Sequence, residues 1–186
     1  RPSRGETVSW TTEFAGLGGD VKYVRSRARA AKYWPVGAGF IFSVTGEGGW
    51  IRSLEDNSVA GQDDVRLTDR YFLGEPQMRG FDIRGVGPRI VRLQYLNDDG
   101  DDATPLVPQT IEEALASDQR VDDALGGKAY YLGRAELEIP LGSGAREMGL
   151  RPSIFLDVGS LFSVTQPVLQ DYPNGLQATD GNGNLL

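Results

Sequence analysis

The sequence contains no cysteine and no histidine among its 186 residues. The absence of cysteine excludes disulfide bonds and cysteine-based zinc sites, and it leaves the cellular compartment open. The absence of histidine removes the commonest general base and the commonest metal ligand. Basic residues are outnumbered as well, since 19 Lys and Arg stand against 26 Asp and Glu, for a net charge of -7. This balance argues against nucleic-acid binding, which needs a basic surface.

Long apolar runs are also missing, and none approaches the roughly 20 residues that a transmembrane helix needs. The mean hydropathy of -0.33 is typical of a soluble protein. A transmembrane β-barrel still fits, because its strands alternate apolar and polar residues and keep the average low. The chain begins at Arg1 without an apolar leader and ends in a polar, turn-rich stretch. We therefore expect it to be a section of a longer protein.

Five segments show the two-residue alternation of β-strands. In the first, Val8, Trp10 and Phe14 share one face, and threonines and a glutamate occupy the other. The expected strands are residues 6–15, 21–34, 39–52, 129–140 and 150–163. Glycine-rich turns separate several of them, as hairpins require. The pattern predicts an all-β antiparallel sheet with one apolar face and one charged face.

The charged face carries both signs. In the second segment a strand aligns three arginines that a helix would scatter; these are Arg25, Arg27 and Arg29. The fourth and fifth segments supply carboxylates on the corresponding face; these are Glu136, Glu138 and Asp157. A soluble β-sandwich with a solvated polar face fits this pattern. A barrel with a polar interior also fits, although five strands cannot close one, because the smallest bacterial examples have about eight.

Residues 53–127 connect the third and fourth segments, and this length far exceeds that of an ordinary loop. A short helix is expected at residues 110–116, with Thr110 as its N-cap and two glutamates in the first turn. The acidic stretch at residues 98–102 lacks the spaced ligands of an EF-hand, so we interpret it as solvated rather than as a calcium site.

The same loop contains Arg79, Gly80 and Phe81 within a run dense in glycine and proline. One interpretation is that its arginines are solvated. The other is that Arg79 turns inward to a carboxylate on a later strand, since a guanidinium matches two carboxylate oxygens. Gly80 would permit close approach, and Phe81 would be an apolar anchor.

Two enzymatic or ligand-binding interpretations are weak. Glu136 and Glu138 could serve as the carboxylate pair of a glycosidase, but they lie about 7 Å apart on one strand and nothing else indicates a sugar cleft. The glycine-rich stretches at residues 16–20 and 84–89 lack both the spacing and the following helix of phosphate-binding loops.

Three motifs, taken together, resemble the BamA-type outer-membrane assembly superfamily. Residues 69–89, DRYFLGEPQMRGFDIRGVGPR, resemble the signature of its sixth extracellular loop, with Met78 where valine is usual. Residues 124–141 resemble the strand that follows that loop. Residues 155–159 resemble its Phe-x-x-Asp-x-Gly pattern with one residue fewer, and residues 4–36 are similar to two preceding strands.

The resemblance implies a transmembrane barrel of about 16 strands in the bacterial outer membrane, preceded by periplasmic POTRA domains. This chain would supply about five strands and one long, inward-folding extracellular loop. The implied function is folding and inserting other β-barrel proteins, with no enzymatic activity, cofactor or metal. The implied partners are unfolded outer-membrane proteins, accessory outer-membrane lipoproteins and membrane lipid, and not nucleic acid.

The resemblance also implies a loop latch, made of Arg79, Gly80, Phe81, Glu138 and Asp157. In it the arginine enters the barrel and pairs with the two carboxylates. Two alternatives remain. One is a two-partner secretion translocator of the same superfamily, and the other is a soluble β-sandwich binding module. We expect the isolated chain to aggregate in water, because a sheet with two open edges and an apolar face seeks partners.

Overall fold

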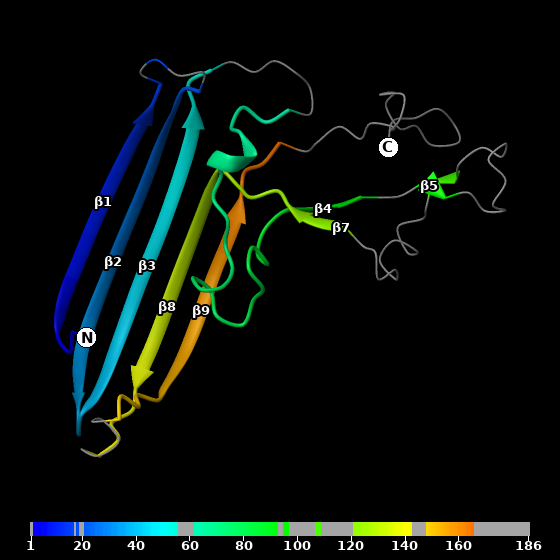
Figure 1. The fold of residues 1–186 in the computed structure, drawn as a ribbon. Coiled ribbons are helices and arrows are strands. Elements are labelled where there is room, and N and C mark those ends of the chain that lie inside the picture. Colours follow the sequence, from blue (N-terminus) through cyan, green and yellow to red (C-terminus); the bar gives the residue numbers. More distant parts are fainter. Residues whose placement is uncertain are drawn as a thin grey trace.

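Five long strands form one antiparallel sheet in this computed structural model (Figure 1). The structure describes residues 2–16, 18, 21–55, 62–92, 95–96, 107–108, 121–142 and 148–165. The long strands are β1 (Gly5–Ala15), β2 (Tyr23–Gly37), β3 (Phe40–Ser53), β8 (Ala129–Glu138) and β9 (Ser153–Phe162). They lie in the order β1-β2-β3-β8-β9, and β1 and β9 are the open edges among the described strands. The prediction of an all-β antiparallel fold is confirmed, and the sheet is not closed into a barrel.

The remaining described elements are short. They are η1 (Leu67–Asp69), β4 (Arg89–Arg92), β5 (Tyr95–Leu96), β6 (Val107–Pro108) and β7 (Val121–Ala124). Strand β4 pairs with β7, and β5 pairs with β6. The helix expected at residues 110–116 and the acidic stretch at residues 98–102 lie outside the described residues. Among the described residues, no helix is long and apolar enough to cross a membrane.

The strand register gathers the apolar side chains on one face of the sheet. Trp10 lies opposite Ala28, Ala28 opposite Gly48, and Gly48 opposite Tyr131, so these residues form a row across four strands. Their side chains point the same way because successive residues of a strand alternate between faces. Large apolar side chains on this face stay exposed, and Trp10 is 77% exposed. In a β-sandwich a second sheet would cover such a face.

The other face of the sheet carries the folded-back beginning of the long loop (Figure 1). The hydrophobic core lies between the two. The loop contributes Val65, Tyr71, Leu73 and Met78, and strands β3, β8 and β9 contribute Ile51, Tyr130 and Leu161. Tyr71 packs on Tyr130 with ring centroids 4.7 Å apart. The beginning of the loop therefore packs against the charged face of the sheet, as the expected inward fold requires.

A glycine in β3 makes this close packing possible. A Cβ atom at Gly49 would lie 2.6 Å from the ring of Tyr130 and 2.9 Å from the hydroxyl of Tyr71, so any side chain there would displace the loop. The side chain of Tyr71 instead reaches across and donates a hydrogen bond to the carbonyl of Ser26 at 3.1 Å. The core thus depends on the absence of a side chain at Gly49 of β3, beneath the loop.

Candidate functional site

The loop segment between residues 73 and 86 is a compact double turn. A bridge between Leu73 and Val86 closes it at the base. Within it, the N–H of Met78 donates to the carbonyl of Gly74 at 2.8 Å. A Cβ atom at Gly74 would collide with the carbonyl of Asp82, because the two halves of the double turn are in contact there. These turns bury Met78 and direct the neighbouring Arg79 at the sheet.

Arg79 binds Asp157 of β9 through three hydrogen bonds. Its Nε and Nη2 donate to the two carboxylate oxygens, each at 3.1 Å, and its backbone N–H donates to Oδ2 at 3.2 Å. The guanidinium carbon lies 3.3 Å from the ring centroid of Phe155, so the cation is stacked on an aromatic face. The Asp157 side chain is only 3% exposed. The hydrogen bonds with Asp157 raise the pKa of the Arg79 guanidinium above its ordinary value. Burial lowers this pKa, and the negative charges of Asp157 and Glu136 raise it further.

Two residues of β8 complete the arrangement. Arg134 donates from Nε to Asp157 at 2.7 Å and from Nη2 to the backbone carbonyl of Gln77 in the loop, also at 2.7 Å. Glu136 lies 3.6 Å from the Nη1 atom of Arg79. We call this set the Arg79 cluster; its members are Arg79, Arg134, Glu136, Phe155 and Asp157. Two cations and two anions balance there, which lets the charges stay ionised in a restricted space.

The structure gives Glu138 a different neighbour from the one expected. Its carboxylate lies 3.5 Å from Arg151, whereas Glu136 occupies the place beside Arg79. The register explains this, because Asp157 faces Arg134, and Glu136 is one two-residue step of about 7 Å farther along β8. Glu138 is two such steps away. The geometry therefore favours Glu136 over Glu138 as the second carboxylate.

The other two residues of the expected loop latch also take different roles. Gly80 has a positive φ of 84°, and nothing lies within 4 Å of the position of a Cβ atom, so it is needed for its backbone conformation rather than for close approach. Phe81 is 44% exposed and is not a buried anchor. The aromatic ring that contacts Arg79 belongs to Phe155. Phe155 lies two residues before Asp157, so strand alternation puts both side chains on the charged face, and this was the available signal in the sequence.

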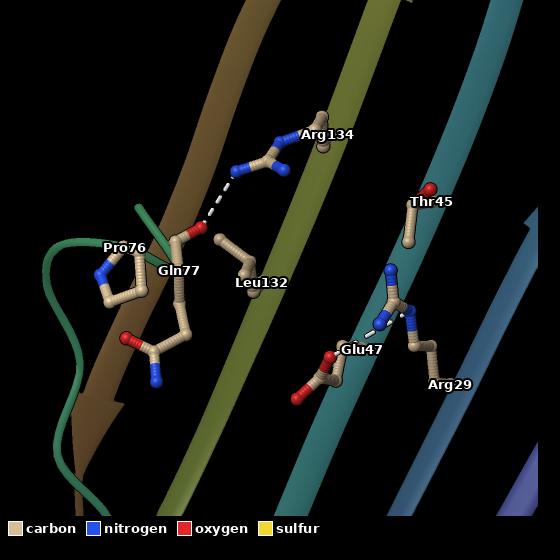
Figure 2. A pocket seen from close by; sticks show the side chains of 7 residues that line it. All are labelled: Arg29, Thr45, Glu47, Pro76, Gln77, Leu132 and Arg134. Atoms are coloured by element: carbon tan, nitrogen blue, oxygen red, sulfur yellow. Dashed lines mark hydrogen bonds and ion pairs between the residues drawn. The ribbon is translucent and has the colours of Figure 1, made fainter. Parts of the chain in front are cut away.

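A hollow of about 220 Å³ lies beside the Arg79 cluster, between the loop and the sheet (Figure 2). It is lined by Arg29, Thr45, Glu47, Pro76, Gln77, Leu132 and Arg134. Its charges are paired: Arg29 lies 3.9 Å from Glu47, and Arg134 contacts both Gln77 and Asp157. Among the described residues, no three His, Cys, Asp or Glu side chains gather as metal ligands would. The paired groups of this site hold two chain segments together.

Comparison with known proteins gives one family. The model of the Omp85 superfamily domain matches residues 1–178. The outer membrane protein assembly factor BamA of Neorickettsia risticii is 31% identical over 174 residues, which are 88% of this chain and 17% of that protein. The sorting and assembly machinery component 50 homologs of Mus musculus and Homo sapiens are each 26% identical over 166 residues, 86% of this chain and 28% of theirs.

A solved structure shows the same fold. The crystal structure of BamA from Haemophilus ducreyi lacking POTRA domains 1-3 superposes with a TM-score of 0.61 at 22% identity, over 87% of this chain and 27% of that one. The chain thus spans less than a third of the length of each of these relatives.

Proposed function

The chain belongs to the Omp85 superfamily, and from this premise we propose that it is part of a factor that folds and inserts β-barrel proteins into the bacterial outer membrane. The names of its relatives, an outer membrane protein assembly factor and sorting and assembly machinery components, support this proposal. Its substrates are unfolded outer-membrane proteins. Its other partners are accessory outer-membrane lipoproteins and lipid, and its action needs neither covalent chemistry nor a cofactor.

The uncovered apolar face is the observation that carries the proposal. Aromatic residues mark both of its ends: Trp34 stacks on Phe42 with centroids 5.7 Å apart, and Trp50 and Phe162 lie in one row at the opposite end. Eight residues of β3 separate Phe42 from Trp50, about 27 Å along the strand. At a tilt of about 40° this is a height of about 21 Å, comparable with the ~25 Å apolar band of outer-membrane barrels.

The Arg79 cluster would hold the loop inside such a barrel. An arginine that is stacked and bound by two carboxylate oxygens fixes both the position and the direction of the loop. The loop then supports the inner wall along β8 and β9 and keeps the barrel in shape. Substrate strands would be recruited elsewhere, at an edge where the barrel opens and offers unpaired backbone groups.

The test uses cells depleted of the native protein that express the intact gene with Arg79→Glu, and with Arg79→Glu combined with Asp157→Arg. The outer-membrane proteome is quantified for each. We expect a broad loss of β-barrel proteins in the single variant and partial recovery in the double variant, because the exchange restores opposite charges. Loss of one secreted protein with an intact barrel profile would contradict the proposal and indicate a two-partner secretion translocator.

A further inference from the structure

A second cluster of charged groups lies at the start of the described loop, away from the Arg79 cluster. At its centre is Asp63, whose side chain is only 1% exposed. We call this cluster the root clamp; its members are Asp63, Asp64, Arg70 and Lys128. From Lys128 to Arg134 is six residues along an extended chain, about 20 Å. The two clusters therefore attach different parts of the loop.

The Asp63 carboxylate joins three segments that are distant in sequence. Its Oδ2 accepts a hydrogen bond from the N–H of Thr165, just beyond β9, at 2.7 Å. Its Oδ1 accepts one from the N–H of Val65, within the loop, at 3.0 Å, and lies 3.2 Å from the Nζ atom of Lys128, at the start of β8. A buried carboxylate with this many donors is stabilised as the anion.

Arg70 and Lys128 extend the attachment from both sides. Arg70 lies 3.8 Å from Asp63 and donates to the carbonyls of Val65 and Leu125, at 3.1 and 2.9 Å. Lys128 also binds Asp64 at 2.6 Å. The backbone continues the same contact, because the N–H of Tyr71 donates to the carbonyl of Gly127 at 3.0 Å. The beginning and the end of the loop are thus tied to each other and to the exit of β9.

We propose that Asp63 is a positioning residue, which docks the root of the loop on the end of the sheet independently of Arg79. Two attachments about 20 Å apart fix the orientation of the intervening chain. A single attachment would allow this chain to rotate about it. With the root docked, the double turn that carries Arg79 stays above β9, and Arg79 needs to find Asp157 only locally. Release of Arg79 then frees the double turn, which we call the tip, and leaves the root of the loop in place.

The absence of cysteine from this chain allows a direct test by single-cysteine labelling. The intact protein, in lipid bilayers and without other cysteines, carries one reporter at a time: Val65→Cys under the root, Met78→Cys under the tip, or Ala31→Cys in the sheet. All three positions are buried, so a maleimide reacts with the thiol only when the site opens. Each reporter is combined with Asp63→Asn, Glu6→Gln or Arg79→Ala. Glu6→Gln is the control, because it removes an exposed carboxylate charge that pairs with Lys32 between β1 and β2, outside both clusters.

We expect Asp63→Asn to accelerate labelling at position 65 by about tenfold or more, and at position 78 to a smaller extent. Arg79→Ala should accelerate labelling at position 78 and leave position 65 protected. Glu6→Gln should change either rate by less than about twofold, as is usual for an exposed pair.

Three results would overturn the proposal. In the first, position 65 stays protected in Asp63→Asn. In the second, Arg79→Ala exposes position 65 as strongly as Asp63→Asn does. In the third, Asp63→Asn accelerates labelling at position 31 as much as at position 65, which would show a general loss of stability. None of these readings depends on assembly activity, so the proposed function stands or fails separately.

Discussion

Asp157 accepts hydrogen bonds from both Arg79 and Arg134, which reach it from the loop and from the neighbouring strand. One carboxylate therefore serves two cations, and each cation has a second contact of its own: Glu136 for Arg79 and the Gln77 carbonyl for Arg134. This asymmetry makes the members of the Arg79 cluster unequal, and it ranks the variants that would test them.

Asp157→Asn should destabilise the intact barrel more than Arg79→Ala does. The first change removes the buried carboxylate that two partly exposed guanidinium groups share. Breaking a fully buried pair costs about 3–5 kcal/mol, which is the upper bound here. The second leaves Asp157 paired with Arg134, so only hydrogen bonds to a charged group are lost, at about 1.5–3 kcal/mol. Urea unfolding of the purified protein measures the order. Arg151→Ala is the control, with an expected cost of about 0–1 kcal/mol for its half-exposed pair with Glu138. An effect of Arg79→Ala as large as that of Asp157→Asn would contradict the ranking.

Phe155→Leu should weaken the docking of the loop although every charge remains. The ring lies directly against the Arg79 guanidinium, and a cation–π contact of this kind contributes about 0.5–2 kcal/mol. Phe81→Leu is the matched comparison, because Phe81 lies on the loop close to Arg79 in sequence but is half-exposed. Maleimide labelling of Met78→Cys reports the release of the tip. A larger effect of Phe81→Leu would show that the motif phenylalanine, and not Phe155, holds the loop.

The fold was predictable because its signal is local. Alternation in each segment assigns side chains to faces without knowledge of the partner strand, and Val8, Trp10 and Asp157 all lie on the faces expected. Register is not local. It depends on how β8 slides against β9, and the sequence offered two carboxylates, Glu136 and Glu138, on one face of β8. Only the pairing of Arg134 with Asp157 across the strands separates them.

The root clamp was beyond sequence reasoning for a similar reason. Asp63 and Asp64 look like solvated loop charges, and their partner Lys128 is 64 residues away from Asp64. The contact of Asp63 with the backbone N–H of Thr165 cannot be predicted from residue types, because almost every residue has a backbone N–H. Long-range contacts made by backbone groups appear only when the chain is folded.

A charge placed on the apolar face should be tolerated according to its depth. Val158 belongs to the row midway between the two aromatic ends, and Ile154 lies in the row of Trp34 and Phe42. In a bilayer, Val158→Arg should cost about 2–4 kcal/mol and Ile154→Arg about 0–1 kcal/mol. The fraction of intact protein that folds into vesicles over a urea series measures both. Similar costs at the two depths would indicate that this face does not contact lipid.

The root clamp should resist mild acid. Burial raises the pKa of Asp63, but the hydrogen bonds from Thr165 and Val65 and the charge of Arg70 outweigh it and hold the pKa far below its ordinary value of 3.8. A carboxyl group with a depressed pKa in the folded state contributes its full stability above the unfolded value and loses it as the pH falls below that value. Asp64, Arg70 and Lys128 face Asp63, and the two cations keep their charge in acid. Labelling of Val65→Cys with a reagent that reacts in acid, such as a dithiodipyridine, should therefore show constant protection from pH 7 to about pH 5, relative to a free thiol at each pH. A loss of protection within that window would mean that the pKa of Asp63 is raised above its ordinary value, and that burial outweighs the donors that hold it as the anion.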